Sequence, residues 1–542
     1  MTKSWFTPAE GDDPWFKPEL RTQAYDKIGD AYDDKLYETL SEDWREDDPQ
    51  PYLKYVREAS ADWPHLRLLA DFMEVGTVPQ RWKDIRPEEP KPKPEPVRVL
   101  DYDDTSEVKM KEIHSADRLR QSLRDGLSPG AAVKFRLYVV HDLSRDVIEA
   151  LGQELNIDAD FFRSHIVDYA WYNVRDRWRD PPVPELVGRR RNWLQMRYVT
   201  ARYFDSSAEF EDATKEAQGF NVLRRPDDDL SNRAWWDKNG AIVAITRCRA
   251  TYWLPPNHAQ AGSSIGVLLL DPTVKHGKPL WGGRRNCRQT PTPRSFAERA
   301  PLAGESLKPN LFFDDFMHWA THTEAFLTPS TSNAHVPMQT LLHLACSEWQ
   351  TMCDYIKTRL CQIDLEVVKP EKFATDRHSK HALEKLHMWR RFVPLYREMV
   401  DETLRHVFRF PCQPPPPMDT ITVPAVPPAS APVSVGQQRT TTPPKGTKHH
   451  HPITAYEADF LTIRAALDEY QQRIDRLTAV VTAVMTIEDA RRGLKDNHNI
   501  GRLTFLATFF IPFSLVAGIF SMQQDLGDAL LGGMTLQRFF EV

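Results

Sequence analysis

The residues whose types and spacing could do chemistry lie late in the chain, in an apolar segment. Leu503–Gln524 holds 22 consecutive residues without a charge, and about 20 apolar residues cross a bilayer as a helix. At about 100° per residue, small and weakly polar side chains cluster on one face of this helix, opposite an aromatic face. The first face holds Ile500, Leu503, Ala507, Ile511, Ser514, Gly518 and Ser521, and the second holds Phe505, Phe509, Phe513, Val516 and Phe520. A small-residue face permits either close helix packing or the lining of a narrow path.

No constellation typical of covalent catalysis is present. The sequence lacks the phosphate-loop, dinucleotide and zincin signatures. His343 and Cys346 share a helical face, but core packing explains that pair more simply than metal binding. A chance run in a solvated linker explains His449–His451, and we expect Asp227–Asp229 to be a solvated loop. We therefore predict no enzymatic activity and no covalently bound cofactor.

Charge and cysteine usage narrow the class of protein further. The net charge of −6 provides no global basic field, so we expect no nucleic-acid partner. Arg189–Arg191 with Trp171, Trp178 and Trp193 could bind phosphate or nucleic acid, but we expect the arginines at the surface and the tryptophans in the core. The six cysteines form no CxxC pair, which is typical of reduced thiols. The first residues, Met1–Phe16, resemble neither a secretory signal nor a mitochondrial transit peptide, so the plasma membrane is the default location.

The elements that must position the apolar helix begin with a sheet. Lys134–His141 alternates and is rich in β-branched and aromatic residues, and similar runs follow at 194–204, 241–254 and 264–270. Short helical patterns separate these runs, which indicates an α/β layer domain. The predicted fold class is α+β/α: a cytosolic α/β layer domain plus long antiparallel stalk helices, the last continuing into a single transmembrane helix.

This interpretation divides the chain into seven regions. They are a charged, irregular N-terminal region with a Pro-rich spacer (1–98), the α/β domain (99–330), stalk helices (331–410), a disordered Pro-rich linker (411–452), a coiled-coil stalk helix (453–502), the transmembrane helix (503–522) and a short tail (523–542).

The last stalk helix carries the clearest periodicity. Thr454–Glu457 is a capping-box signature for a helix start. Apolar residues then recur at steps of three and four, which is typical of a coiled-coil seam. The seam residues are Phe460, Ile463, Leu467, Tyr470, Ile474, Leu477, Val481 and Val484. Basic residues precede the apolar span and Asp525 and Asp528 follow it, so the N-terminal bulk should be cytosolic.

The segment Asn497–Gln523 (NHNIGRLTFLATFFIPFSLVAGIFSMQ) resembles the first transmembrane helix of the CorA family of divalent-cation channels. That family's pattern reads N-x-x-M-K-x-L-T followed by I-F-x-P-L-T-F-I-A-G-I-Y-G-M-N. Matching or closely similar places are taken by Asn497, Leu503, Thr504, Phe510, Pro512, Phe513, Ala517, Gly518, Ile519 and Met522. Upstream, RLYVVHDLSRDVIEALGQELNIDADFFRSHI and DYAWYN resemble the cytosolic domain of the divergent fungal-type branch.

The resemblance implies a funnel-shaped homopentamer in a membrane, with divalent cations, Mg²⁺ by default, passing between five stalk helices. Asn497 would form a polar ring at the cytosolic side, Ile500 and Leu503 a hydrophobic constriction, and Ser514 and Gly518 the upper pore. Ala507 and Ile511 complete the implied ion pathway. No resident metal site can be assigned.

Two departures from the family pattern qualify this expectation. Its Gly-Met-Asn selectivity signature is replaced by Ser521, Met522 and Gln523, and the longer Gln side chain would sit differently. Only 19 residues follow Gln523, without the second apolar run that the family carries. The alternative function is therefore a non-conducting, single-pass, membrane-anchored scaffold or regulatory protein.

Overall fold

The computed structural model describes residues 50–75, 96–103, 108–127, 133–167, 182–188, 190–222, 224, 226–229, 237–256, 263–283, 292–294, 311–323, 326, 330, 332–368, 378–410 and 452–522. Most of the spacer and of the Pro-rich linker, the triplet His449–His451 and the tail 523–542 lie outside these residues. The chain forms two compact units, Met1–Gln362 with Met388–Gln472 and Ile363–His387 with Arg473–Val542.

The first unit is built on a mixed sheet. Its strands are β1 (Val97–Asp103), β2 (Lys109–Ile113), β3 (Val133–His141), β4 (Trp193–Phe204), β5 (Pro226–Asp228), β6 (Ile242–Trp253), β7 (Ser264–Leu270) and β8 (Lys278–Pro279). The order is β2-β1-β3-β7-β6-β4-β8, and β5 pairs with β6. Strands β3 and β7 run parallel, whereas the other pairs are antiparallel. The strands contain long runs of buried residues, as expected for a sheet covered on both faces.

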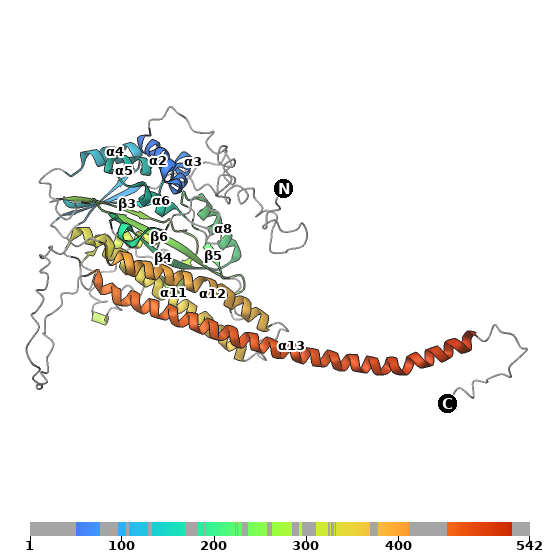
Figure 1. Cartoon of the computed structure of the whole chain (residues 1–542). Helices are drawn as coiled ribbons and strands as arrows, with labels where there is room; N and C mark the ends of the chain where they lie inside the picture. The colour runs from blue at the N-terminus through green and yellow to red at the C-terminus, as the bar shows by residue number, and fades with distance from the viewer. Residues whose placement is uncertain are drawn as a thin grey trace, which may run out of the picture. The chain divides into compact units, whose positions relative to one another are not determined.

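In the part of the chain that the structure describes, helices α2 to α6 cover one face of this sheet (Figure 1). They are α2 (Pro51–Asp62), α3 (Arg67–Val75), α4 (Ala116–Asp125), α5 (Arg145–Leu155) and α6 (Ala159–Ile166), with the short η4 (Pro64–Leu66) between α2 and α3. The region 1–98 was expected to be irregular with a few helical stretches; α2, η4 and α3 lie within it and contribute Leu53, Leu69 and Phe72 to the α/β core.

Helix α2 is fixed by residues far away in the sequence. The Glu149 carboxylate accepts hydrogen bonds from the Tyr52 and Leu53 amides at 2.9 and 3.0 Å, whereas the residue before the helix, Gln50, makes no side-chain cap. A Cβ at Gly152 would lie 2.5 Å from the Tyr52 ring. Glycine at this position therefore allows α2 and α5 to pack closely.

The other helices among the described residues are α7 (Glu185–Gly188), α8 (Ser207–Gly219), η7 (Leu280–Gly282), α10 (Phe312–Thr321), η10 (Asn333–His335), α11 (Val336–Val368), α12 (His378–Glu402), the π-turn η12 (Thr403–Val407), η13 (Thr454–Tyr456) and α13 (Glu457–Met522). Within the first unit, α11 and α12 lie against the face of the sheet opposite α2–α6 (Figure 1). Trp349 of α11 and Trp389 of α12 are completely buried. Helix α12 continues through Pro394.

Helix α13 confirms the predicted seam over most of its length. Seven of the eight predicted seam residues, from Phe460 to Val481, are buried, and Val484 is half-buried. The seam packs within a single chain: the Phe460 ring lies 5.7 Å from that of Phe408, and Arg397 and Asp468 form an ion pair at 2.9 Å. The predicted fold class is therefore confirmed: an α/β sheet domain with long helices, the last of which is long and apolar enough to span a membrane.

Candidate ion pathway on helix α13 and two buried charge networks

All seven predicted pathway residues lie on helix α13. They are Asn497, Ile500, Leu503, Ala507, Ile511, Ser514 and Gly518. Within one chain all but the half-buried Ala507 are exposed, and the exposed fractions of Ile500, Leu503 and Ile511 are 60%, 67% and 63%. Ser521 and Met522 end the helix, and Gln523 lies outside the described residues. One chain therefore presents this face on a single helix.

Hydroxyl groups in the apolar segment bond to the helix itself. The Thr504 and Thr508 hydroxyls donate to the Ile500 and Thr504 carbonyls at 2.8 and 2.7 Å. Ser514 donates to the Ile511 carbonyl at 2.9 Å. Such internal bonds satisfy polar groups where no water is present, as in a hydrocarbon layer.

Two acidic residues that sequence reasoning missed lie on the side of α13 that carries the predicted pathway residues, which we call the pathway face. At about 100° per residue, Asp489 and Asp496 fall within about 20° of Ala507 and Ser514. Both side chains are exposed. Carboxylates on a path-lining face attract cations, and extending the helical arithmetic by three turns toward the N-terminus would have found them.

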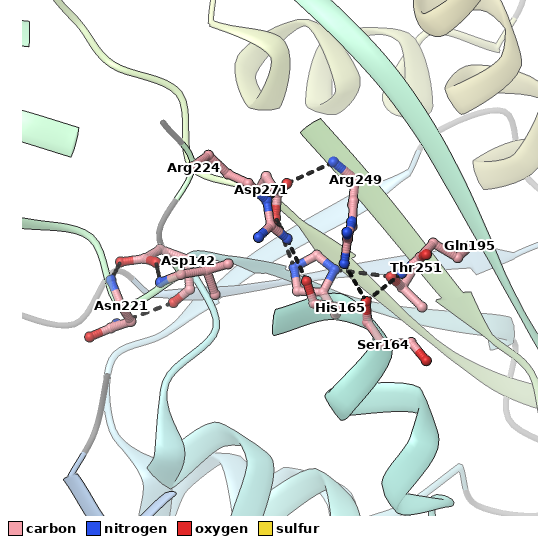
Figure 2. Close-up of polar contacts among 10 residues, drawn as sticks. Asp142, Ser164, His165, Gln195, Asn221, Arg224, Arg249, Thr251 and Asp271 are labelled. Carbon is pink, nitrogen blue, oxygen red and sulfur yellow. Dashed lines mark hydrogen bonds and ion pairs between the residues drawn. The ribbon is translucent and has the colours of Figure 1, made fainter. Parts of the chain in front are cut away.

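A polar network lies at the carboxyl ends of the two parallel strands (Figure 2). Asp142 follows β3 in a left-handed conformation with φ 58°. Its carboxylate accepts hydrogen bonds from the Asn221 and Val222 amides, both at 2.9 Å. Aspartate tolerates this conformation better than most residues, so Asp142 fastens the segment after α8 to the end of β3.

Asp271, which follows β7, is the centre of the first buried charge network. Arg224 holds its carboxylate in a bidentate ion pair at 2.5 and 3.1 Å and also donates to the His165 carbonyl. The Arg249 amide donates to Asp271 at 2.7 Å. The His165 ring nitrogen Nδ1 lies 2.9 Å from the Thr251 hydroxyl, and Nε2 lies 3.2 Å from Asp271 Oδ1 without the geometry of a hydrogen bond.

This network has the properties of a structural clamp. Burial lowers the pKa of His165 to about 3, and the neighbouring Asp271 carboxylate offsets only part of that effect. The imidazole is therefore neutral near pH 7. Because the side chains of His165 and Asp271 are fully buried, a dissolved substrate cannot reach them. The charges join α6, β6 and β7 where the parallel strands end.

The second network overturns one expectation. Asp227–Asp229 was expected to be a solvated loop, but Pro226–Asp228 forms strand β5 and Asp229 is only 1% exposed. Its carboxylate accepts hydrogen bonds from Arg359 at 2.7 Å and from the Tyr355 hydroxyl. Arg359 also pairs with Asp237 at 2.8 Å. Burial and the adjacent Asp229 raise the pKa of Tyr355 well above its usual value, so the tyrosine stays a donor.

The other candidate groups do not assemble into a reactive site among the described residues. The His343 ring packs 4.5 Å from the Trp319 ring, its Nδ1 lies 2.9 Å from the Tyr456 hydroxyl, and Cys346 is buried, which confirms the core interpretation. Trp193 is buried as predicted, with the Arg191 guanidinium 4.7 Å from its ring centre. The described residues hold no cluster of three or more metal-binding side chains.

Comparison with known proteins finds similar chains among solved structures. No family model matches the sequence, and no curated protein matches it. Among solved structures, the CorA magnesium transporter from Methanocaldococcus jannaschii is similar, with 10% sequence identity and a TM-score of 0.34 over 82% of this chain and 92% of that one.

Proposed function

We propose that this chain is one subunit of a CorA-like divalent metal cation transporter, with Mg²⁺ the default ion. Several copies would form a path in the membrane between their α13 helices. One observation carries the proposal: a helix buried along its seam to Val481 continues into an exposed apolar segment that divides into a small-residue face and an aromatic face.

The exposed apolar segment needs a covering that one chain does not supply. Phe505, Phe509 and Phe513 are 72%, 59% and 48% exposed, and so large a contiguous apolar surface marks a membrane or protein interface. The aromatic face suits lipid, and the small-residue face suits other copies at close range. A single helix cannot enclose a path, so the function requires a homo-oligomer. The sequence resemblance favours a pentamer.

The chemistry of the small-residue face suits a hydrated cation. Mg²⁺ gives up its water reluctantly, so neutral groups such as the Asn497 amide and the Ser514 hydroxyl can contact its hydration shell. Ile500 and Leu503 would form an apolar constriction that gates by excluding water. Asp489 and Asp496 would raise the local cation concentration at the cytosolic entrance. Ser521, Met522 and Gln523 would take the place of the family's selectivity loop.

The charges that flank the apolar segment indicate its orientation in the membrane. Arg491, Arg492, Lys495 and Arg502 precede the span, which favours a cytosolic position for the N-terminal bulk. We propose the plasma membrane as the default membrane.

A flux assay tests the function. The full chain is reconstituted in liposomes with an entrapped divalent-sensitive dye, and Mg²⁺ or Zn²⁺ entry is followed. We expect Leu503→Asp to change the flux several-fold, because a charge hydrates the constriction, whereas Phe509→Tyr on the lipid-facing side should leave it unchanged.

The outcomes separate the two candidate functions. Reversed effects of the two substitutions would show that the faces are assigned wrongly. Well-folded, membrane-inserted oligomers that pass no divalent cation would reject transport and favour the scaffold function.

A further inference from the structure

Four basic residues before the apolar span gather on one side of helix α13. At about 100° per residue, Arg491, Lys495, His498 and Arg502 fall within about 60° of one another. We call these four residues the basic stripe; all of them are exposed. The acidic Asp489 and Asp496 fall about half a turn away, on the pathway face. These two groups therefore occupy opposite sides of the helix, while Arg492 falls between them and Glu488 falls beside Lys495.

The basic stripe continues directly into the aromatic face. Phe505, Phe509 and Phe513 cover the same angular range as the stripe, by the same arithmetic of about 100° per residue. The side of the helix that suits lipid tails within the span is therefore the side that carries cations just before it. Cations placed there point toward lipid headgroups rather than toward a path between copies.

The distances along the helix fit a headgroup layer. At about 1.5 Å per residue, the 20 residues of 503–522 span about 30 Å, the thickness of the hydrocarbon core. Arg502 then lies at the boundary, His498 about 6 Å before it and Lys495 about 10 Å before it, which covers the headgroup region. Arg491, about 16 Å before it, adds to the field through solvent, where screening acts over about 8–10 Å.

The surface is also hollowed at this level. An open hollow on α13 is lined by Arg502 and Phe505, together with Leu494, His498, Gly501, Leu506 and Asn497 of the predicted pathway, and a Cβ at Gly501 would meet no atom within 4 Å. The Arg502 guanidinium and the Phe505 ring match the two chemistries of a phospholipid, a phosphate and apolar chains.

We propose that the basic stripe binds anionic phospholipids of the leaflet at the N-terminal end of the span. The inference rests on the membrane placement of α13 in the proposed function, but not on transport. Charge complementarity commits the surface to this partner, because Lys and Arg near an anionic leaflet each contribute roughly fivefold to association.

Spin-labelled lipids provide the test. The full chain is reconstituted in phosphatidylcholine vesicles with a trace of spin-labelled phosphatidylglycerol or phosphatidylcholine, and the motionally restricted fraction of each is measured by electron spin resonance. We expect the anionic label to be favoured about threefold or more at low salt, with the preference falling at high salt. The triple substitution Arg491→Gln, Lys495→Gln, Arg502→Gln should remove the preference.

Matched variants keep the result specific. The double variant Arg491→Lys, Arg502→Lys preserves the charges and should preserve the headgroup preference. Arg492 lies about 100° from Arg491 around the helix, outside the stripe, so Arg492→Gln should also preserve it. If lipid is restricted without headgroup preference, or if the preference survives the triple substitution, the proposal that the basic stripe binds anionic lipid is wrong. The proposal that α13 spans the membrane would still stand. No restricted lipid of either kind would overturn both the stripe and the span. A headgroup preference in vesicles that show no cation flux would support the stripe while rejecting transport.

Discussion

Seam residues of helix α13 such as Leu467 and Ile474 are 0% exposed, whereas Ile487 and Leu494 are 55% and 70% exposed. Both groups are branched aliphatic residues on the same helix, so helix propensity does not separate them. What differs is the covering: helices of the same chain cover the seam, whereas the described residues of one chain leave the later residues exposed, and we propose that lipid or other copies cover them. On that proposal, apolar residues stabilise the fold in one half of α13 and the assembly in the other.

Charged residues show the same contrast. Arg359 in the first unit is 9% exposed and shared between Asp229 and Asp237, whereas the exposed Arg502 lies beside the span. We expect Arg359→Met to lower the free energy of unfolding by about 3–5 kcal/mol, because it leaves the buried Asp229 carboxylate without its cation. Denaturant unfolding in detergent, followed by tryptophan fluorescence, measures the change.

Arg502→Gln is the matched control for that substitution. It removes an exposed cation and should change the same free energy by no more than about 0.5 kcal/mol. Equal effects of the two substitutions would remove the distinction between folding charges and interface charges.

The apolar residues provide the next largest effect. We expect Leu467→Ala to cost about 2–5 kcal/mol of unfolding free energy, because it leaves a cavity in a packed seam. Leu494→Ala, at a 70% exposed position, should cost about 0.5 kcal/mol or less in the monomer. A large loss for Leu494→Ala in the monomer would mean that the second half of α13 is covered by its own chain.

The parts of the fold that depend on local pattern could be predicted from the sequence. The seam from Phe460 to Val481 follows from spacing within one helix, and so do the two faces of the apolar segment. The burial of Asp229 could not be predicted, because its partner Arg359 lies 130 residues later. The cap of helix α2 could not be predicted for the same reason, since Glu149 lies 97 residues beyond Tyr52. Local periodicity carries no information about such pairings.

Because His165 is buried in the first unit, we expect the free energy of unfolding of that unit to depend on pH. Its pKa is about 3 in the folded chain and about 6.5 when unfolded. Below pH 6.5 the unfolded state therefore binds a proton that the folded state refuses, and stability falls as the pH falls toward 3. Between pH 7 and pH 5 this group alone should cost about 2 kcal/mol.

The contribution of His165 is measured by comparing how the unfolding free energy changes with pH in the unmodified chain and in His165→Gln. His165→Gln shares every other titrating group, so its unfolding free energy should depend less on pH between 7 and 5 than that of the unmodified chain. Parallel curves for the two proteins would mean that the imidazole is already protonated in the folded state or reaches solvent.

The smallest predicted effect is that of Gly493→Ala, which should act differently on the monomer and on an assembly of several copies. Gly493 is exposed, and a Cβ there would meet no atom within 4 Å. In the monomer, Gly493→Ala should therefore stabilise α13 by about 0.5–1 kcal/mol, because alanine loses less backbone entropy in a helix. By helical arithmetic of about 100° per residue, Gly493 falls on the pathway face between Asp489 and Asn497. If neighbouring copies approach closely there, the added methyl group should weaken subunit association while the monomer gains helicity. Circular dichroism and sedimentation of the same sample measure the two quantities, and a gain in both would mean that copies do not meet at this level of the helix.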